Sequence, residues 1–129
     1  MHVAHANRRQ ADLIRTLLTQ GRKLETQTPR TDALGSDFGR LGFKLIEAVK
    51  AEGSRATEDL RYLDLLVDFR NAIGHGNETE MASLSAGGEI TATKTVYRRY
   101  RRIVQRLAAT MDRVVALKMG AALGIQSPW

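Results

Sequence analysis

The sequence predicts an all-α protein, an up-and-down bundle of four or five helices that forms a single domain over residues 1–129. Three observations predict this fold class. Apolar residues recur at helical spacing in four segments, no segment shows the convincing alternation of a strand, and no internal repeat is present. A chain of 129 residues that is 43% hydrophobic has the usual size of one domain and is apolar enough to bury a core.

The first two helices are predicted from apolar periodicity. The first covers residues 7–27, with apolar positions at Ala11, Ile14, Leu17, Leu18 and Leu24. The second follows the turn-like stretch "PRTDALGSD" at residues 29–37, where either Asp32 or Ser36 is the expected N-cap. Gly53 is expected to end it, and its buried face is predicted to consist of Phe38, Leu41, Leu45, Ile46 and Val49.

The third helix is predicted to begin at Thr57, an N-cap residue followed by the carboxylates of Glu58 and Asp59, which suit the positive end of the helix dipole. Its apolar positions are Tyr62, Leu65, Leu66, Phe69 and Ile73. Beyond it, residues 76–93 are small and polar, and the glycine pair at 87–88 indicates a turn or a flexible connection rather than an element. A short strand pair is the less favoured alternative there.

The last helix is predicted over residues 94–123, because its apolar residues keep an alternating four-three spacing throughout. These residues are Val96, Tyr100, Ile103, Leu107, Thr110, Val114, Leu117 and Ala121. From Lys94 onward, eight basic residues accompany the single acid Asp112, so this segment carries a charge of +7 while the whole chain carries +6. Such concentrated charge favours a polyanionic partner, either nucleic acid or the acidic face of another protein.

The composition also restricts the kinds of site and the location of the protein. The chain has no cysteine, which excludes disulfides and thiolate metal sites and suits a reducing compartment. Its first ten residues lack the apolar core of a signal peptide, and no run of about 18 apolar residues is present to span a bilayer. We therefore expect a cytoplasmic protein with no membrane contact. His2 and His5 have no carboxylate cluster beside them, so we expect no metal site and no cofactor.

The stretch "DFRNAIGHG" at residues 68–76 places an arginine, an amide and an imidazole at the predicted end of the third helix. On a regular helix, Arg70 and His75 point about 140° away from each other. Gly74 and Gly76 change this expectation, because glycine at a helix end readily takes left-handed torsions that let the imidazole turn toward the guanidinium. The simpler interpretation is that one of these glycines is a C-cap and that His75 complements the helix dipole.

The sequence "RNAIGHG" at residues 70–76 of a small all-α chain closely resembles the R-x4-6-H signature of the HEPN superfamily. The resemblance covers the motif strongly and the helical layout of nearly all the chain loosely. It implies a dimeric helical bundle that cleaves RNA without a metal, commonly as a toxin or an antiviral-defence effector. Carried over to this chain, Arg70 and His75 are the catalytic pair and Asn71 is the polar residue that follows the arginine. Members paired with a nucleotidyltransferase antitoxin often continue to His-x-Tyr, and Asn77 at that position argues against nucleotide transfer onto a motif tyrosine.

Metal-independent RNA cleavage needs a base for the 2′-hydroxyl proton, an acid for the leaving 5′-oxygen and positive charge near the phosphorane. One imidazole does not easily perform both proton transfers in one step. We therefore expect a homodimer that brings two motifs to one groove. Arg70 would hold phosphate oxygens with its fork of donors, and Asn71 would fix the shape of the motif.

The stretch "VYRRYRRIVQR" at residues 96–106 is predicted to contact RNA, because helical spacing directs most of its arginines away from the apolar stripe and no acid accompanies them. Tyr97 in this stretch is available to stack on an unpaired base. The predicted RNA-binding residues are Tyr97, Arg98, Arg99, Arg101, Arg102 and Arg106. An ordinary solvated face is the alternative interpretation, and an acidic antitoxin or inhibitor protein would also suit this charge.

The sequence leaves two alternative functions open. One is a catalytically inactive HEPN-like module that binds nucleotides or nucleic acid, or serves in assembly, and in which the motif only caps a helix. The other is a basic helical adaptor unrelated to that family, in which Arg70 and His75 face different surfaces.

Overall fold

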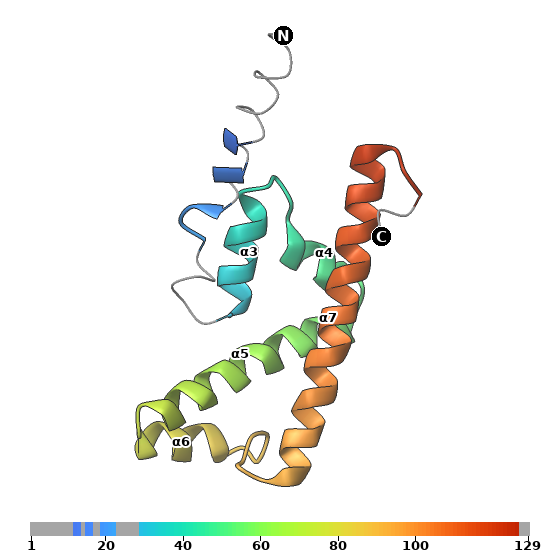
Figure 1. Ribbon diagram of the computed structural model, residues 1–129. Coiled ribbons are helices and arrows are strands. Elements are labelled where there is room, and N and C mark those ends of the chain that lie inside the picture. The colour runs from blue at the N-terminus through green and yellow to red at the C-terminus, as the bar shows by residue number, and fades with distance from the viewer. Residues whose placement is uncertain (1–11, 14, 17–18, 23–28, 127–129) are drawn as a thin grey trace.

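The computed structural model describes residues 12–13, 15–16, 19–22 and 29–126. Within this part of the chain the regular elements are all helices, which confirms the predicted all-α bundle. Residues 29–126 form α3 (Thr31–Gly39), α4 (Leu45–Ala51), α5 (Ser54–Gly74), α6 (Glu78–Ser85) and α7 (Lys94–Leu123) (Figure 1). Of the helix predicted over residues 7–27, residues 12–13, 15–16 and 19 are helical and 20–22 are not, and the rest lies outside the described residues.

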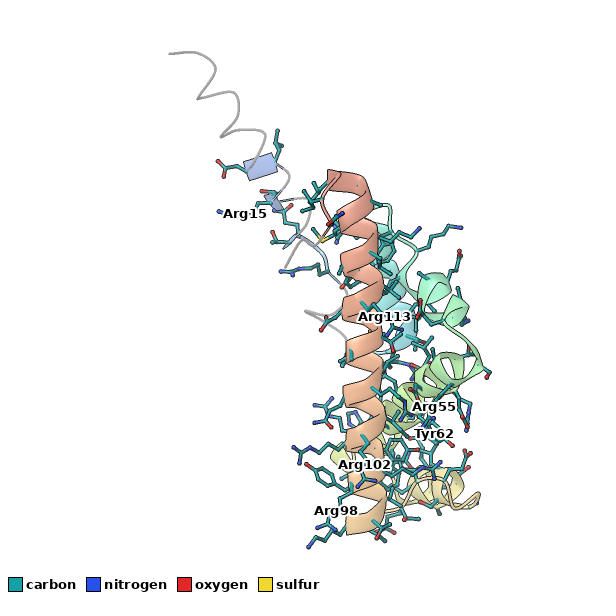
Figure 2. All side chains as sticks on the ribbon, turned by 90° about the vertical axis from the view of Figure 1, so that its right-hand side faces the viewer. Arg15, Arg55, Tyr62, Arg98, Arg102 and Arg113 are labelled. Carbon is teal, nitrogen blue, oxygen red and sulfur yellow. The ribbon has the colours of Figure 1, made fainter. Side chains whose placement is uncertain are left out.

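The long helix α7 organises the molecule. It stands in front of the other helices in Figure 2, and α5 and α6 lie on one side of it in Figure 1. The chain directions of α5 and α7 are opposed, because Asp59 bonds Arg106 whereas Tyr62, one turn later on α5, bonds Arg99. This pairing places the first half of α5 against the first half of α7.

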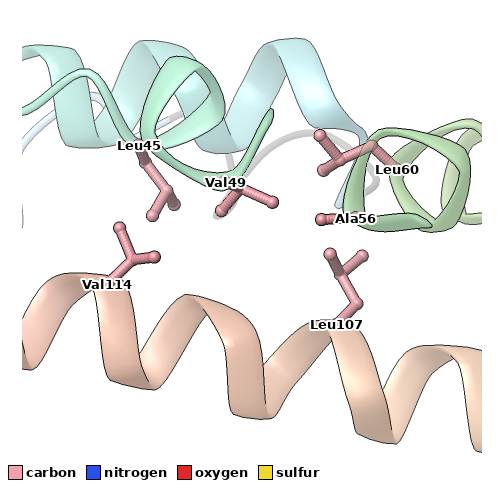
Figure 3. Packing of buried hydrophobic residues seen from close by; sticks show 6 residues of the cluster. All are labelled: Leu45, Val49, Ala56, Leu60, Leu107 and Val114. Carbon is pink, nitrogen blue, oxygen red and sulfur yellow. The ribbon is translucent and has the colours of Figure 1, made fainter. Parts of the chain in front are cut away.

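Two apolar clusters hold α7 in place. The first joins α4, α5 and α7 and consists of Leu45, Val49, Ala56, Leu60, Leu107 and Val114 (Figure 3). The second fills the space between α5, α7 and the segment before α7, and consists of Tyr62, Phe69, Ile90, Tyr100 and Ile103. A fully buried side chain of this size stabilises a fold by about 1.5–3 kcal/mol, so these contacts determine how α7 is seated.

The second predicted helix is two helices in the structure, so a single helix ending at Gly53 is wrong. α3 ends at Gly39, and the backbone turns at Gly42, whose φ of +73° lies in the left-handed region. The carbonyl of Phe38 accepts hydrogen bonds from the N–H groups of Leu41 and Phe43, which closes this turn. Leu41 was predicted to be buried, but the turn leaves it 53% exposed.

The start of α3 is capped by another helix rather than by Asp32 or Ser36. The carboxylate of Asp64 on α5 accepts a 2.9 Å bond from the backbone N–H of Thr31 and a 2.6 Å bond from its hydroxyl. A carboxylate at this end also suits the helix dipole. The predicted local cap is replaced by a contact that only the tertiary structure supplies.

The third helix begins at Ser54 rather than at the predicted Thr57. Gly53 precedes it with a φ of +127°, and the Thr57 hydroxyl donates back to the Gly53 carbonyl from inside the first turns. Asp59, predicted as a dipole residue, is only 2% exposed. Its carboxylate is taken up by Arg106 instead.

The segment 76–93 contains a helix that the polar composition did not predict. The Asn77 side chain accepts a 3.1 Å bond from the Glu80 backbone N–H and donates a 2.9 Å bond to the Glu80 carboxylate, so Asn77 is the N-cap of α6. The predicted turn is present at the glycine pair, since Gly88 has a φ of +68°. Beyond it, the guanidinium of Arg61 holds the Glu89 carboxylate by two bonds of 2.9 Å and lowers the pKa of that carboxyl.

The last helix occupies Lys94–Leu123, as predicted. The Thr93 side chain accepts a bond from the Val96 N–H at its start, and Gly124 ends it with a φ of +67°. Across the described ranges of the chain, no helix combines the length and the apolar character that a membrane crossing requires.

Replacement of Tyr100 by Phe is expected to stabilise the fold. Tyr100 is buried, and its hydroxyl has no hydrogen-bond partner in the part of the chain that the structure describes. Removing a buried hydroxyl of this kind should raise the free energy of unfolding by about 1 kcal/mol, as measured by urea unfolding.

The same substitution should change the pH dependence of stability. Burial raises the pKa of Tyr100 to about 12. The unfolded chain then releases this proton first, near its ordinary value of about 10, so the wild type loses stability as the pH rises from about 10 to about 12. The advantage of Tyr100→Phe should therefore widen above pH 10, and a variant that is less stable than the wild type at neutral pH would contradict this account.

Candidate functional site

The motif lies at a glycine-capped helix end. The N–H of Gly76 donates to the Ile73 carbonyl at 3.1 Å, and the N–H of Asn77 donates to the Ala72 carbonyl at 2.9 Å. With a φ of +63° at Gly76, this is the Schellman arrangement. The predicted glycine C-cap is confirmed at Gly76, whereas Gly74 lies inside α5.

The cap does not turn His75 toward Arg70. His75 keeps helical torsions, with φ −94° and ψ −1°, because the left-handed residue comes after it rather than before it. The expectation that the glycines rotate the imidazole toward the guanidinium is therefore wrong, and the two side chains leave the helix about 140° apart. Both residues are exposed.

The side chains of the motif have no bonding partner within the part of the chain that the structure describes. No hydrogen bond or ion pair joins the side chain of Arg70, Asn71 or His75 to any residue that the structure describes. Asn71 contributes its backbone carbonyl, which accepts the His75 N–H at 2.9 Å, and its side chain is half-buried. The motif therefore ends α5 through its backbone and leaves its charged and polar groups available.

The first halves of α5 and α7 enclose a groove of about 860 Å³. It is rich in arginines from both helices, and we call it the arginine groove. Its charged lining residues are Arg55, Arg98, Arg99, Arg102, Arg106, Glu58 and Asp59. Figure 2 looks onto the face of the molecule that carries Arg55, Arg98 and Arg102. Arg55, which the sequence did not single out, belongs to this groove together with four of the predicted RNA-binding residues.

Two of these arginines are engaged within the protein. Arg106 donates to the buried Asp59 carboxylate through Nε at 2.7 Å and Nη2 at 2.5 Å, and this contact raises the pKa of Arg106. Arg99 donates to the Tyr62 hydroxyl at 2.6 Å, and its guanidinium lies 4.9 Å from the centre of the Tyr62 ring. A paired carboxylate this deeply buried requires its partner, so Arg106 has a structural role.

The remaining groove arginines are free to bind an anion. Arg55, Arg98 and Arg102 are exposed, and none of them forms an ion pair or side-chain hydrogen bond within the described ranges. The one acid of the groove without a partner arginine there is Glu58. After pairing is taken into account, the groove is strongly cationic.

Two predicted RNA-binding residues lie on the other flank of α7. Tyr97 and Arg101 line a second pocket of about 580 Å³, which we call the apolar pocket. Its apolar walls include Leu66, Phe69, Ile73, Val96 and Val104. Tyr97 is 65% exposed and Ile73 is 51% exposed, so this surface is partly open. The structure thus divides the predicted set between two faces of one helix.

The motif borders the apolar pocket and is distant from the arginine groove. Arg70 lies one turn from Ile73 on α5, at the spacing of surface neighbours. Tyr62, the groove residue on α5 nearest to Arg70 in sequence, lies eight positions before it, which corresponds to about 12 Å along the helix. The predicted catalytic residues and the cationic surface are therefore two separate features of one monomer.

Arg55 was missed because its place in the groove depends on the packing of α5 against α7, which are distant in the sequence. Its spacing of four from Asp59 and seven from Tyr62 places the three on one side of a helix. That signal is present in the sequence, but it becomes meaningful only once α5 is known to lie against α7.

Neither a metal site nor a relative of known function was found for the described site. Among the described residues, no group of three or more histidine or carboxylate side chains is arranged to hold a metal ion, and His2 and His5 lie outside those residues. Comparisons of the chain with protein-family models, with curated proteins and with solved structures returned no match. The resemblance to HEPN proteins therefore stays a prediction.

Substitution of the two motif glycines by alanine should have opposite effects. Gly76→Ala places a side chain at positive φ and should lower the free energy of unfolding by about 1 kcal/mol. Gly74→Ala is the matched control, because Gly74 is helical and open space surrounds its Cβ position, so a gain of about 0.5 kcal/mol is expected. Urea unfolding of both variants tests the cap, and equal effects would show that it is misplaced.

Proposed function

We propose that this protein is a metal-independent endoribonuclease that acts as a homodimer, with Arg70 and His75 at the reacting centre. As the resemblance implies, it would serve as a toxin or an antiviral-defence effector. The observation that carries the proposal is the availability of both motif side chains, which are exposed and have no partner in the described chain. Exposed side chains that form no hydrogen bond or ion pair at a capped helix end suit contact with a substrate.

A second copy of the chain supplies what one monomer lacks. Within one chain Arg70 and His75 diverge, and a single imidazole does not easily serve as both acid and base. The apolar pocket lies beside the motif and exposes Ile73, Tyr97 and Val104. Packing two such surfaces across a twofold axis would bury apolar area and bring two α5 ends together.

The proposed reaction needs only protein side chains. One His75 takes the 2′-hydroxyl proton, the 2′-oxygen bonds to phosphorus, and the bond from phosphorus to the 5′-oxygen breaks. The His75 of the other copy, in its protonated form, gives a proton to that 5′-oxygen. Arg70 balances the charge of the phosphorane. The products are a 2′,3′-cyclic phosphate and a 5′-hydroxyl.

A nucleic-acid-binding module without cleavage is the second candidate. The specific observation in its favour is the complete hydrogen-bonded cap at Gly76, which explains the glycines and the position of His75 without any chemistry. In this case the arginine groove would carry the function and His75 would be dispensable.

Incubation of purified protein with mixed RNA in chelator separates the two candidates. His75→Ala and Arg70→Ala should each reduce cleavage by about 10²-fold or more and abolish cyclic phosphate ends, because acid–base catalysis and charge stabilisation each contribute at least this much. Lys118→Ala, a remote exposed charge on α7, serves as the control. Cleavage that persists in the motif variants would rule out the proposed reaction.

The dimer has its own test. Ile73→Asp puts a charge on the exposed wall of the apolar pocket and should shift the protein to monomers in sedimentation experiments. Cleavage should fall with the dimer fraction, while the circular-dichroism signal of the helices stays unchanged, because Ile73 is half-exposed and its replacement leaves the monomer folded. A monomeric wild type that cleaves RNA at full rate would contradict the two-copy site.

A further inference from the structure

We propose that the arginine groove is a binding site for the sugar-phosphate backbone of single-stranded RNA, held by Arg55, Arg98 and Arg102 and not by Arg101. The inference rests on the proposed function for the choice of nucleic acid as ligand. Its physical basis is independent of the motif, because Tyr62, the groove residue on α5 nearest to Arg70 in sequence, lies about 12 Å from Arg70 along the helix axis.

The charge of the groove is not compensated by the protein. Arg106 forms an ion pair with Asp59, and Arg99 donates a hydrogen bond to the Tyr62 hydroxyl. Among the lining residues, the guanidiniums of Arg55, Arg98 and Arg102 are therefore opposed only by the carboxylate of Glu58. Guanidinium groups bind phosphate oxygens through paired donors, which favours a phosphate-bearing ligand.

The N-terminal turns of α5 and α7 add to the positive electrostatic potential of the groove. Ser54 in the first turn of α5 and Thr95 in the first turn of α7 both line the groove. Neither first turn contains an acidic residue, so the positive ends of both helix dipoles are left without a protein counter-charge. Free backbone N–H groups at such helix starts are further donors for phosphate oxygens.

The shape of the groove favours a single strand. Arg98 and Arg102 lie one turn apart on α7, about 6 Å along the axis, and Arg55 faces them from α5. A flexible single strand can follow a row of cations inside a concave groove. The groove volume of about 860 Å³ also matches a short segment of ligand rather than a duplex.

The groove offers no platform for reading bases. Its aromatic residue, Tyr62, is buried and contacts Arg61 and Arg99, while the exposed Tyr97 lies on the opposite flank of α7. Binding should therefore depend on phosphates and salt and be nearly independent of sequence.

The test measures binding rather than cleavage. A fluorescent 12-nucleotide 2′-O-methyl RNA of mixed sequence, which has no free 2′-hydroxyl, is titrated with the full-length protein in chelator at several salt concentrations. Arg55→Ala, Arg98→Ala and Arg102→Ala should each weaken binding about 3- to 10-fold and reduce the slope of log affinity against log salt by about 0.7, the value for one lost contact on a single strand.

Two further variants keep the result interpretable. Arg101→Ala removes the same charge from the adjacent position but from the apolar pocket, so its slope should equal that of the wild type. Glu58→Gln removes the opposing acid and should strengthen binding about 2- to 3-fold, an effect that misfolding cannot produce.

Each outcome has a defined meaning. Equal losses in Arg101→Ala and Arg102→Ala, or wild-type binding in all three groove variants, would overturn the groove. Preferential binding of polyglutamate over the RNA would also overturn it, in favour of an acidic protein partner. Groove-dependent binding without any cleavage activity would sustain this inference and remove only the proposed ribonuclease.

Discussion

The apolar contact between α7 and the α4–α5 pair is the constraint on which the rest of the structure depends. Leu107 and Val114 of α7 pack against fully buried residues such as Leu45 and Val49. This contact fixes the rotation of one rigid 30-residue helix and therefore which of its side chains face each flank of α5. The cationic groove and the apolar pocket are consequences of that single rotation, and the ion pair of the buried Asp59 with the partly exposed Arg106 holds the same register.

The parts of this fold that could be predicted are those with strong local signals. α7 was predicted at its observed bounds because thirty residues repeat one apolar pattern. The break between α3 and α4 depends on Gly42 in a left-handed turn, and the cap of α3 depends on Asp64 from another helix, so neither follows from periodicity. α6 was missed although Asn77 and Glu80 have capping-box spacing, because the composition around them is small and polar.

Four of the five arginines in the arginine groove were predicted from the sequence, but Arg55 and the grouping of the residues were not. Spacing along a helix identified the arginines of residues 98–106, yet only the packing of α5 shows that Arg101 belongs with Tyr97 and Ile73 whereas Arg102 belongs with Arg55. In the same way, the glycines around His75 predicted a cap, but which glycine takes the positive φ is set by the backbone of the α5–α6 connection. The proposed function therefore involves two surfaces, a cationic one that suits phosphates and an apolar one beside the motif that suits a second copy.

The ribonuclease proposal and the groove proposal together imply that one RNA strand engages both the arginine groove and the motif. An NMR titration of the protein with a 2′-O-methyl RNA in chelator tests it directly, by following the Nε–H signals of the arginines and the ring signals of His75 together. Signals of Arg55, Arg98, Arg102 and His75 are expected to shift with one common affinity while the signal of Arg101 is unchanged. Shifts confined to Arg101 and Tyr97, or an imidazole that does not respond while the groove is saturated, would contradict it.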